Sequence, residues 1–151
     1  MKSLVLFDSN FGNTKIIAEV IADVLGGKAQ SVNNFNADDL SGVDLLVVGS
    51  PINAWRATEK IRYFLSNLKT LKLNKISAAA FDTRIRIFFS GNAAKRIGKS
   101  LVEAGAELIT PPLAFYVKDK EGPLAEGEIE KAKSWAAHLK TINRNHAVKK
   151  A

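Results

Sequence analysis

The sequence contains no cysteine, and this absence excludes several functional classes. Without a thiol there is no disulfide framework, no thiolate nucleophile and no zinc or iron–sulfur site ligated by cysteine. Long apolar runs are also lacking. A membrane helix needs about 20 consecutive apolar residues, whereas runs such as Leu45–Val48 are far shorter. The first residues enter an apolar segment that is shorter than a signal-peptide core and lacks its cleavage site. We therefore expect a cytoplasmic protein without a membrane span.

The rest of the composition is typical of one folded domain. The chain has 151 residues, of which 46% are hydrophobic and 25% are charged, and these values exclude disordered and fibrous classes. This length suits one hydrophobic core rather than two. We expect a single domain over residues 1–142. Residues 143–151 are polar and basic and lack an apolar period, so we expect them to form a flexible tail.

Positive charge is concentrated in the middle of the chain. The formal net charge is +7, from 22 basic and 15 acidic residues. Residues 1–53 hold three basic and six acidic residues, whereas residues 54–102 hold eleven basic and two acidic ones. Such a concentration can attract an acidic protein, a nucleic acid or a small anion. The alternative is a helix face that is simply solvated.

Short apolar runs alternate with helical patterns along the chain. Continuous apolar runs predict strands that are covered on both faces. These runs are Leu4–Phe7, Leu45–Val48, Ile76–Phe81, and a weaker one at Glu107–Ile109 that resumes at Phe115–Val117. The short segment Ala29–Val32 is a further candidate strand. The segments between them, and the segment after the last run, carry apolar residues at spacings of three and four, which predicts four helices. The alternation predicts an α/β fold, a doubly wound five-stranded parallel sheet of order 2-1-3-4-5 with helices on both faces.

Details of the helical segments predict their ends and their buried aromatic residues. Gly26-Gly27 is expected to end the first helix. Ser90 or Asn92 is expected to cap the third helix. Trp135 lies on the apolar stripe of the last helix and is expected in the core, as are Phe88 and Phe89.

In a doubly wound parallel sheet, ligands bind beyond the carboxyl ends of the strands, where the strand order reverses. The candidate site therefore lies in the loops after the first, third and fourth strands.

The loop after the first predicted strand is rich in small and hydrogen-bonding residues. It reads Ser9-Asn10-Phe11-Gly12-Asn13-Thr14. At a turn from strand to helix, such residues expose backbone N–H groups, and the helix dipole adds a partial positive charge. Gly12 lets the backbone approach a ligand without a Cβ clash. The loop therefore predicts a phosphate site. The alternative is that Asn13 or Thr14 only caps the helix and Gly12 only forms a turn.

This loop resembles the phosphate loop of the flavodoxin family, usually Ser/Thr-x-Ser/Thr-Gly-x-Thr. Gly49-Ser50-Pro51 after the third strand adds to the resemblance, which covers essentially the whole chain. The resemblance implies FMN, held non-covalently, as a carrier of one or two electrons. Phe11 stands where the family usually has Ser or Thr, so one phosphate hydroxyl is missing. A hydrogen bond to a charged group is worth about 1.5–3 kcal/mol, so this change is expected to weaken FMN binding without abolishing it.

The resemblance places the flavin ring between the two other loops. The first of them comprises Pro51, Ile52, Asn53, Ala54 and Trp55, and the second offers Asp82, Thr83 and Arg84 to the polar edge of the ring. Trp55 is expected to stack on the ring, the alternative being that it packs beneath the second helix.

Many family members carry a glycine in the first of these loops, whose peptide flips when the flavin is reduced. This sequence has none between Gly49 and Gly91. A positive φ at Asn53 or Ala54 would therefore cost about 1 kcal/mol or more. Any peptide that must adopt this conformation next to the ring is expected to be strained.

Three functions stay open. The first is an FMN-binding electron carrier that serves an acidic redox protein, with nucleic acid not expected as a partner. The second is a flavin-dependent oxidoreductase on a small anionic or quinone-like substrate, gripped by Arg56, Arg84 and Arg86, if these do not face solvent. The third is a flavin-free binding module of the same fold. No metal site is expected, because His138 and His146 have no third ligand in the sequence. No catalytic side chain is expected either, because the cofactor that the resemblance implies carries the electrons.

Overall fold

The computed structural model describes residues 1–86 and 91–150, and side chains up to His146. The predicted cap Ser90 and the predicted core residues Phe88 and Phe89 lie outside the described residues. The elements are β1 (Ser3–Phe7), α1 (Asn13–Leu25), β2 (Lys28–Ser31), β3 (Leu45–Pro51), α2 (Glu59–Leu71), β4 (Ser77–Ile85), α3 (Ala93–Glu103), β5 (Glu107–Leu108), β6 (Leu113–Val117) and α4 (Glu128–Lys150). Two short 3-10 helices, Val32–Asn34 and Ala37–Leu40, lie between β2 and β3.

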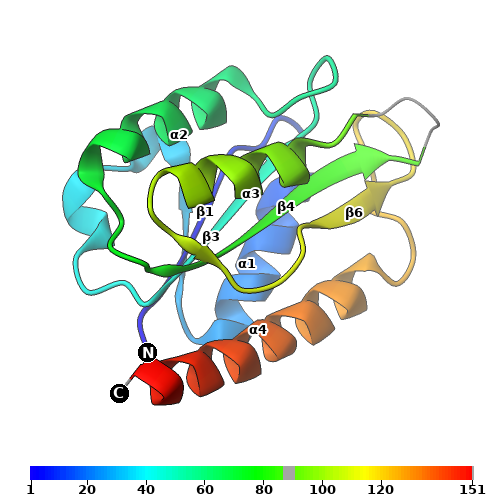
Figure 1. Cartoon of the computed structure of the whole chain (residues 1–151). Coiled ribbons are helices and arrows are strands. Elements are labelled where there is room, and N and C mark those ends of the chain that lie inside the picture. Colours follow the sequence, from blue (N-terminus) through cyan, green and yellow to red (C-terminus); the bar gives the residue numbers. More distant parts are fainter. Residues whose placement is uncertain (87–90, 151) are drawn as a thin grey trace.

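The strands form one parallel sheet of order β2-β1-β3-β4-β5, with β6 also paired to β4 (Figure 1). The predicted order is therefore confirmed. The fifth predicted strand is divided between β5 and β6, as its two apolar segments indicate. Pro111 and Pro112 lie at this division. They have no backbone N–H to donate, so the hydrogen-bond ladder is interrupted there.

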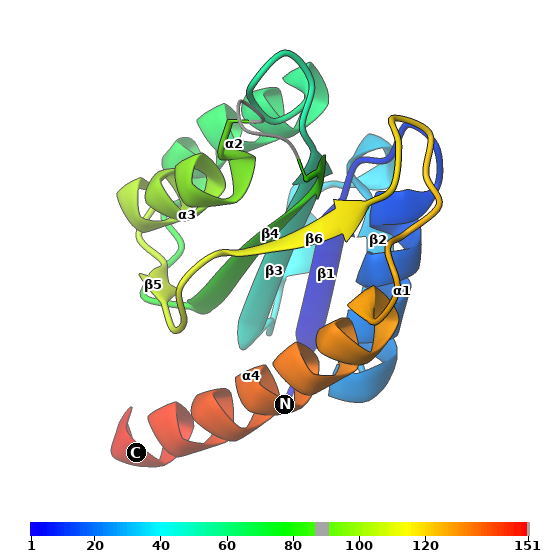
Figure 2. The same cartoon turned by 90° about the vertical axis from the view of Figure 1, so that its right-hand side faces the viewer.

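Helices cover both faces of the sheet, α2 and α3 on one side and α1 and α4 on the other (Figure 2). The central strands are buried on both faces because their residues alternate between the two layers. In β1, Leu4 and Leu6 pack in the α2–α3 layer, whereas Val5 and Phe7 pack in the α1–α4 layer. Trp135 is buried in the α1–α4 layer, which confirms its predicted place in the core.

The helix ends follow the local sequence signals. Gly26 takes the left-handed conformation after α1, with a φ of 68°, and its N–H bonds back to the helix. Asn92 caps α3 by accepting a hydrogen bond from the N–H of Lys95. Among the described residues, no helix has both the length and the apolar character that a membrane crossing requires.

Helix α4 continues past residue 143, where we expected the tail to begin, and ends at Lys150. Asn143 is buried, and its side-chain amide donates to the sulfur of Met1 at 2.8 Å. One turn later, the ring of His146 contacts the carboxylate of Glu107 in β5. These contacts with the amino terminus and the sheet edge are remote in sequence, so the polar pattern of this segment does not reveal them.

Candidate functional site

The loop between β1 and α1 leaves the amino end of a helix without a side-chain cap. Gly12 is the N-cap residue of α1, and no side-chain cap hydrogen bond is formed there. Asn13 and Thr14 are the first residues of the helix, so neither serves as its cap. Gly12 has a φ of 93°, and a Cβ built on it would meet no atom within 4 Å. A helix start of this kind is suited to an external anion.

The hydroxyl of Ser9 organises this loop from within. Its oxygen accepts hydrogen bonds from the backbone N–H of Gly12 at 3.1 Å and from that of Lys15 at 3.4 Å. Asp8 in turn accepts from the N–H of Ser9 at 3.0 Å. Both bonds to Ser9 use its acceptor lone pairs, which leaves the hydroxyl proton to be donated. Asp8 thus stabilises the adjoining loop through this hydrogen bond.

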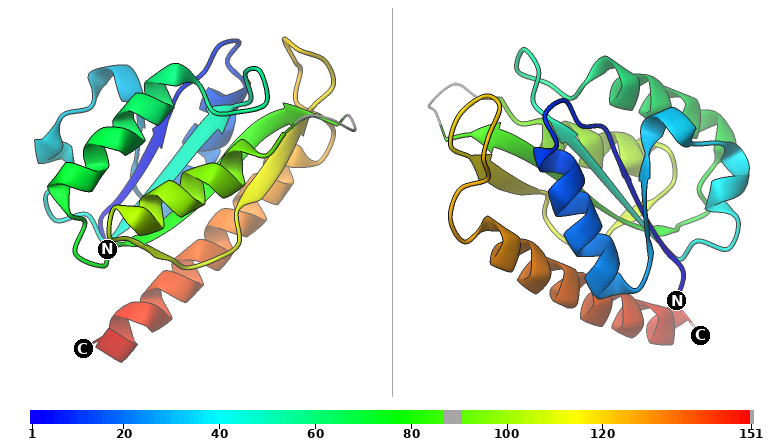
Figure 3. Two further views of the ribbon diagram at one scale, coloured as in Figure 1. Left: turned by 45° about the horizontal axis from the view of Figure 1, so that its top comes forward. Right: turned by 180° about the vertical axis from the view of Figure 1, so that it is seen from behind.

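A cavity of about 570 Å³ lies at the carboxyl ends of the strands and is lined by the loops after β1, β3 and β6 and by the last residues of β4. Figure 3 shows the loops after β1, β3 and β6 at the same end of the sheet. All three predicted loops contribute to its wall. Predicted residues that line it are Asn10, Phe11, Asn13, Thr14, Pro51, Ile52, Asn53, Ala54, Trp55, Thr83 and Arg84. Three predicted residues, Ser9, Gly12 and Asp82, are not part of the lining.

Three further residues line the same cavity and were not predicted: Ile85, Val117 and Lys120. Val117 ends β6 and Lys120 follows it. The fifth predicted strand ends at the same edge of the parallel sheet as the other strands, so the loop that follows it could also have been predicted to line the site. Ile85 is the last residue of β4, which also contains Asp82, Thr83 and Arg84, so these predicted loop residues belong to the strand.

Hydrogen bonds tie the loops to one another around the cavity. The side-chain amide of Asn10 donates to the side-chain oxygen of Asn53 at 3.0 Å. The hydroxyls of Thr14 and Thr83 lie 2.7 Å apart, and both residues are buried. Asn13 donates to the backbone carbonyl of Glu121, in the loop after β6, at 3.1 Å. The helix start and the walls of the cavity therefore form one connected unit.

Trp55 lies in a tight, strained turn. Asn53 and Arg56 exchange two backbone hydrogen bonds, of 2.7 and 3.1 Å, around Ala54 and Trp55. Both central residues have positive φ, 47° and 76°, the pattern of a type I′ turn that favours Asn and Gly. Strain was expected at Asn53 or Ala54, and the structure has it at Ala54 and at Trp55. Trp55 is 56% exposed, so it does not pack beneath α2.

The carboxylate of Asp82 is directed into the protein rather than to the cavity. Asp82 is fully buried and accepts two hydrogen bonds from Arg84, at 2.8 and 2.6 Å, and one from the N–H of Ala94 at 2.8 Å. Arg84 also donates to Asn92, the cap of α3, at 3.2 Å. The hydrogen bonds that Arg84 donates to the Asp82 carboxylate raise the pKa of the Arg84 guanidinium. Asp82 therefore positions Arg84 and the start of α3, which differs from the predicted role at a ring edge.

The three arginines that were candidates for a substrate grip do not converge. Only Arg84 lines the cavity, and its charge is compensated by Asp82. The guanidinium carbon of Arg86 lies 4.0 Å from the ring centroid of Tyr116. Arg56 lines a different groove, between α2 and α3. This arrangement does not favour the hypothesis of an anionic substrate held by these side chains.

A family model and solved structures supply independent comparisons. The family model of the flavodoxin domain matches residues 4–97. The chain belongs to the flavodoxin family. A flavodoxin from the domain Archaea has 21% sequence identity and a TM-score of 0.83, with 95% of this chain and 99% of that chain covered. Flavodoxin 1 from Bacillus cereus has 19% identity and a TM-score of 0.80, with 97% and 99% covered.

The same fold also occurs within larger proteins. The rubredoxin oxygen:oxidoreductase of Desulfovibrio gigas has 22% identity and a TM-score of 0.80, and the match covers 99% of this chain but 37% of that one. At these identities the likeness concerns the fold. No curated protein sequence matches significantly.

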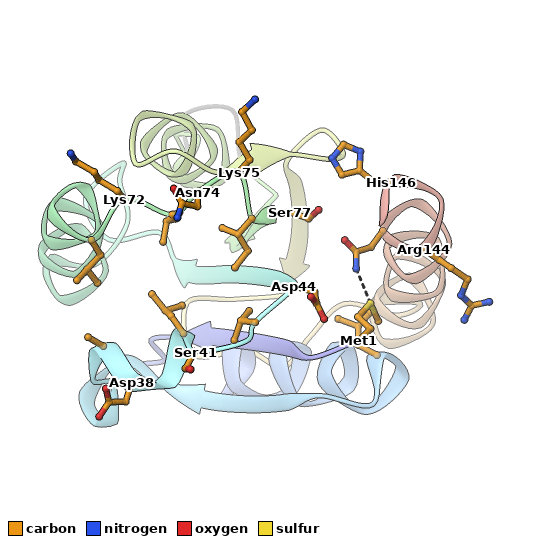
Figure 4. Close-up of a pocket in the computed structure, with 18 of the residues that line it drawn as sticks. Met1, Asp38, Ser41, Asp44, Lys72, Asn74, Lys75, Ser77, Arg144 and His146 are labelled. Carbon is orange, nitrogen blue, oxygen red and sulfur yellow. Dashed lines mark hydrogen bonds between the residues drawn. The ribbon is translucent and has the colours of Figure 1, made fainter. Parts of the chain in front are cut away.

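In the described part of this flavodoxin-family chain, a cavity larger than the candidate site lies away from the predicted residues. It measures about 1090 Å³, and its lining includes residues 71–77 and Met1, at the end of the sheet opposite the three loops (Figure 4). The side chains of Lys72, Lys75 and Arg144 extend away from it. No predicted site residue lines it. These three cations therefore do not converge on the cavity, and the smaller cavity, which collects the predicted site residues, is the better candidate.

Proposed function

We propose that the protein binds FMN non-covalently and exchanges electrons with a protein partner. One observation carries the proposal: the start of α1, whose N-cap is a glycine, and the apolar loop around Trp55 contribute to one site at the carboxyl edge of the sheet. A phosphate suits the first part and a flat apolar ring suits the second. A cavity of about 570 Å³ lies within the range of roughly 300–1,000 Å³ that is usual for small-molecule sites.

The residues present fit the two ends of FMN. The open space beside Gly12 leaves room for a phosphate at the N–H groups of the first turn, with the hydroxyl of Ser9 as a further donor. Trp55 contributes an aromatic side chain to the cavity, and Ile52 and Val117 supply apolar walls that exclude water. Bound FMN supplies reversible transfer of one or two electrons, so no nucleophile or general base from the protein is needed.

Phe11 is expected to weaken phosphate binding without blocking the phosphate site. Its side chain is 49% exposed at the cavity and offers no hydroxyl. The hydroxyl of Ser9, the amide of Asn13 and the backbone N–H groups are left as donors. The missing hydrogen bond is worth about 1.5–3 kcal/mol, so we expect FMN affinity at least about tenfold below that of a loop with the hydroxyl.

Titration of the flavin-free protein tests this function. FMN is expected to lose fluorescence on saturable binding, and riboflavin, which has no phosphate, is expected to bind at least about tenfold more weakly. The Phe11→Thr variant restores the hydroxyl and is expected to tighten FMN binding while leaving riboflavin unchanged. Absence of saturable FMN binding would overturn the proposal and favour a flavin-free binding module.

A further inference from the structure

A second, smaller groove of about 290 Å³ lies between α2 and α3. Four of its lining side chains are cations from three segments: Arg56 before α2, Arg62 and Lys69 on α2, and Arg96 on α3. All four are exposed residues. The groove thus contains part of the positive charge of residues 54–102, a segment with only two acidic residues.

The groove is partly preorganised and only partly neutralised. The Nε of Arg62 donates to the backbone carbonyl of Ala57 at 3.1 Å, which restricts this guanidinium. Lys69 pairs with Glu103 at 3.1 Å. Within the described part of the chain, this is the one ion pair made by a cation of the groove. Clustered like charges repel each other and disfavour the compact state, and an anionic partner would relieve that repulsion.

The groove adjoins the proposed flavin site through a single turn. Trp55 lines the cavity, and its neighbour Arg56 lines the groove. The two backbone hydrogen bonds between Asn53 and Arg56 hold both residues in this turn. A molecule that is bound in the groove therefore lies next to the exposed edge of the site at Trp55.

We propose that the α2–α3 groove is the docking surface for an acidic redox protein, an inference that rests on the proposed function. Carboxylates of the partner pair with Arg62 and Arg96, because guanidinium groups match carboxylates with two parallel hydrogen bonds. Docking there brings the partner's redox centre beside Trp55. A nucleic acid is disfavoured because the cations line a short groove rather than an extended stripe along the backbone of a duplex.

The first test measures binding to the flavin-free protein, so that it does not depend on FMN. The probe is an acidic plant-type [2Fe–2S] ferredoxin in its oxidised form, titrated by calorimetry. Affinity is expected to fall as ionic strength rises from about 0.05 to about 0.3 M, because screening weakens exposed charge pairs. The pair Arg62→Glu with Arg96→Glu is expected to lower affinity at least about tenfold. Affinity that does not change with salt would overturn the proposal.

A matched control separates the groove from total charge. Lys140→Glu with Arg144→Glu changes the net charge by the same amount on α4, away from the groove. We expect these variants to keep affinity within about threefold. Equal losses in both pairs would overturn the assignment to the groove. Thermal melting checks folding. The groove variant loses the hydrogen bond from Arg62 to the Ala57 carbonyl but also loses like-charge repulsion, so its melting temperature is expected to stay close to that of the wild type.

Two outcomes distinguish the docking surface from its alternatives. Tighter binding of a duplex DNA than of ferredoxin, lost in the groove variant, would overturn the proposal in favour of a nucleic acid. FMN binding without ferredoxin binding would refute the docking surface and leave the proposed function standing. Ferredoxin binding at the groove without FMN binding would instead refute the proposed function, and with it the redox role of the partner.

Discussion

The hydroxyl of Thr14, in the first turn of α1, lies 2.7 Å from the hydroxyl of Thr83, near the end of β4. Both residues are buried, with exposures of 1% and 4%. Each hydroxyl therefore satisfies the other in a place with little access to water. This bond joins the helix start that is proposed to hold phosphate to the strand that forms a wall of the cavity.

Removing both hydroxyls is expected to destabilise the protein by less than the sum of the two single removals. Thr83→Val leaves the hydroxyl of Thr14 buried without its partner, at a cost of about 1–3 kcal/mol in the free energy of unfolding. The double variant with Thr14→Val is expected to cost little more than either single one. Urea denaturation measures all three. Thr70→Val, on the exposed side of α2, is the control, with a change within about 0.5 kcal/mol. Additive losses would contradict the direct bond.

The turn at Ala54 is expected to respond oppositely to two substitutions. Its φ of 47° is left-handed, a conformation that costs an ordinary residue about 1 kcal/mol. Asn tolerates it, so Ala54→Asn is expected to raise the free energy of unfolding by about 0.5 kcal/mol. Ala54→Val introduces a branched Cβ and is expected to lower it by at least about 1 kcal/mol. Ala54 is exposed, so lost packing does not confuse the comparison. Equal stabilities would show that the turn is not strained.

The buried pair of Asp82 and Arg84 is expected to matter far more than an exposed pair. Asp82→Asn keeps the shape but removes the charge that compensates Arg84, at a cost of about 3–5 kcal/mol. Glu103→Gln breaks the exposed pair with Lys69 and is expected to cost less than about 1 kcal/mol. Denaturation of both variants gives the comparison. Similar small losses would mean that Arg84 does not depend on Asp82.

Asp39 is expected to make a part of the stability sensitive to acid. Hydrogen bonds from the N–H of Asn36 and from Gln30 hold the pKa of Asp39 below its ordinary value of 3.8. Because this pKa is lowered on folding, its contribution is complete above the unfolded value and is lost as pH falls through the folded one. The stability difference between the wild type and Asp39→Asn should therefore shrink below about pH 4. A difference that stays constant down to about pH 2 would refute this.

The order of strands and helices could be predicted because each element carries its own local pattern. The directions of site side chains depend on one further rule. Residues i and i+2 of a strand share a face, so Asp82 and Arg84 meet beside α3, while Thr83 faces α1 and reaches Thr14. Applied to β4, the alternation would have placed Asp82 beside Arg84 and apart from Thr83.

Other features depend on contacts that are distant in sequence. Trp55 lies in a turn that receives a hydrogen bond from Asn10 of another loop, through Asn53. Gly91 also packs closely against this turn, because a Cβ built on Gly91 would lie 2.3 Å from the carbonyl oxygen of Trp55. The extension of α4 coincides with contacts to Met1 and Glu107. No local pattern reports either of these relationships.

The backbone amide resonances of the loop after β1 test the central claim most directly. In a ¹⁵N-labelled flavin-free protein, FMN is expected to shift the N–H signals of Gly12, Asn13 and Thr14 strongly, and riboflavin is expected to shift those around Trp55 but these three far less. Shifts from FMN that are confined to residues 71–77, beside the large cavity at the opposite end of the sheet, would contradict the assignment of the phosphate to the start of α1.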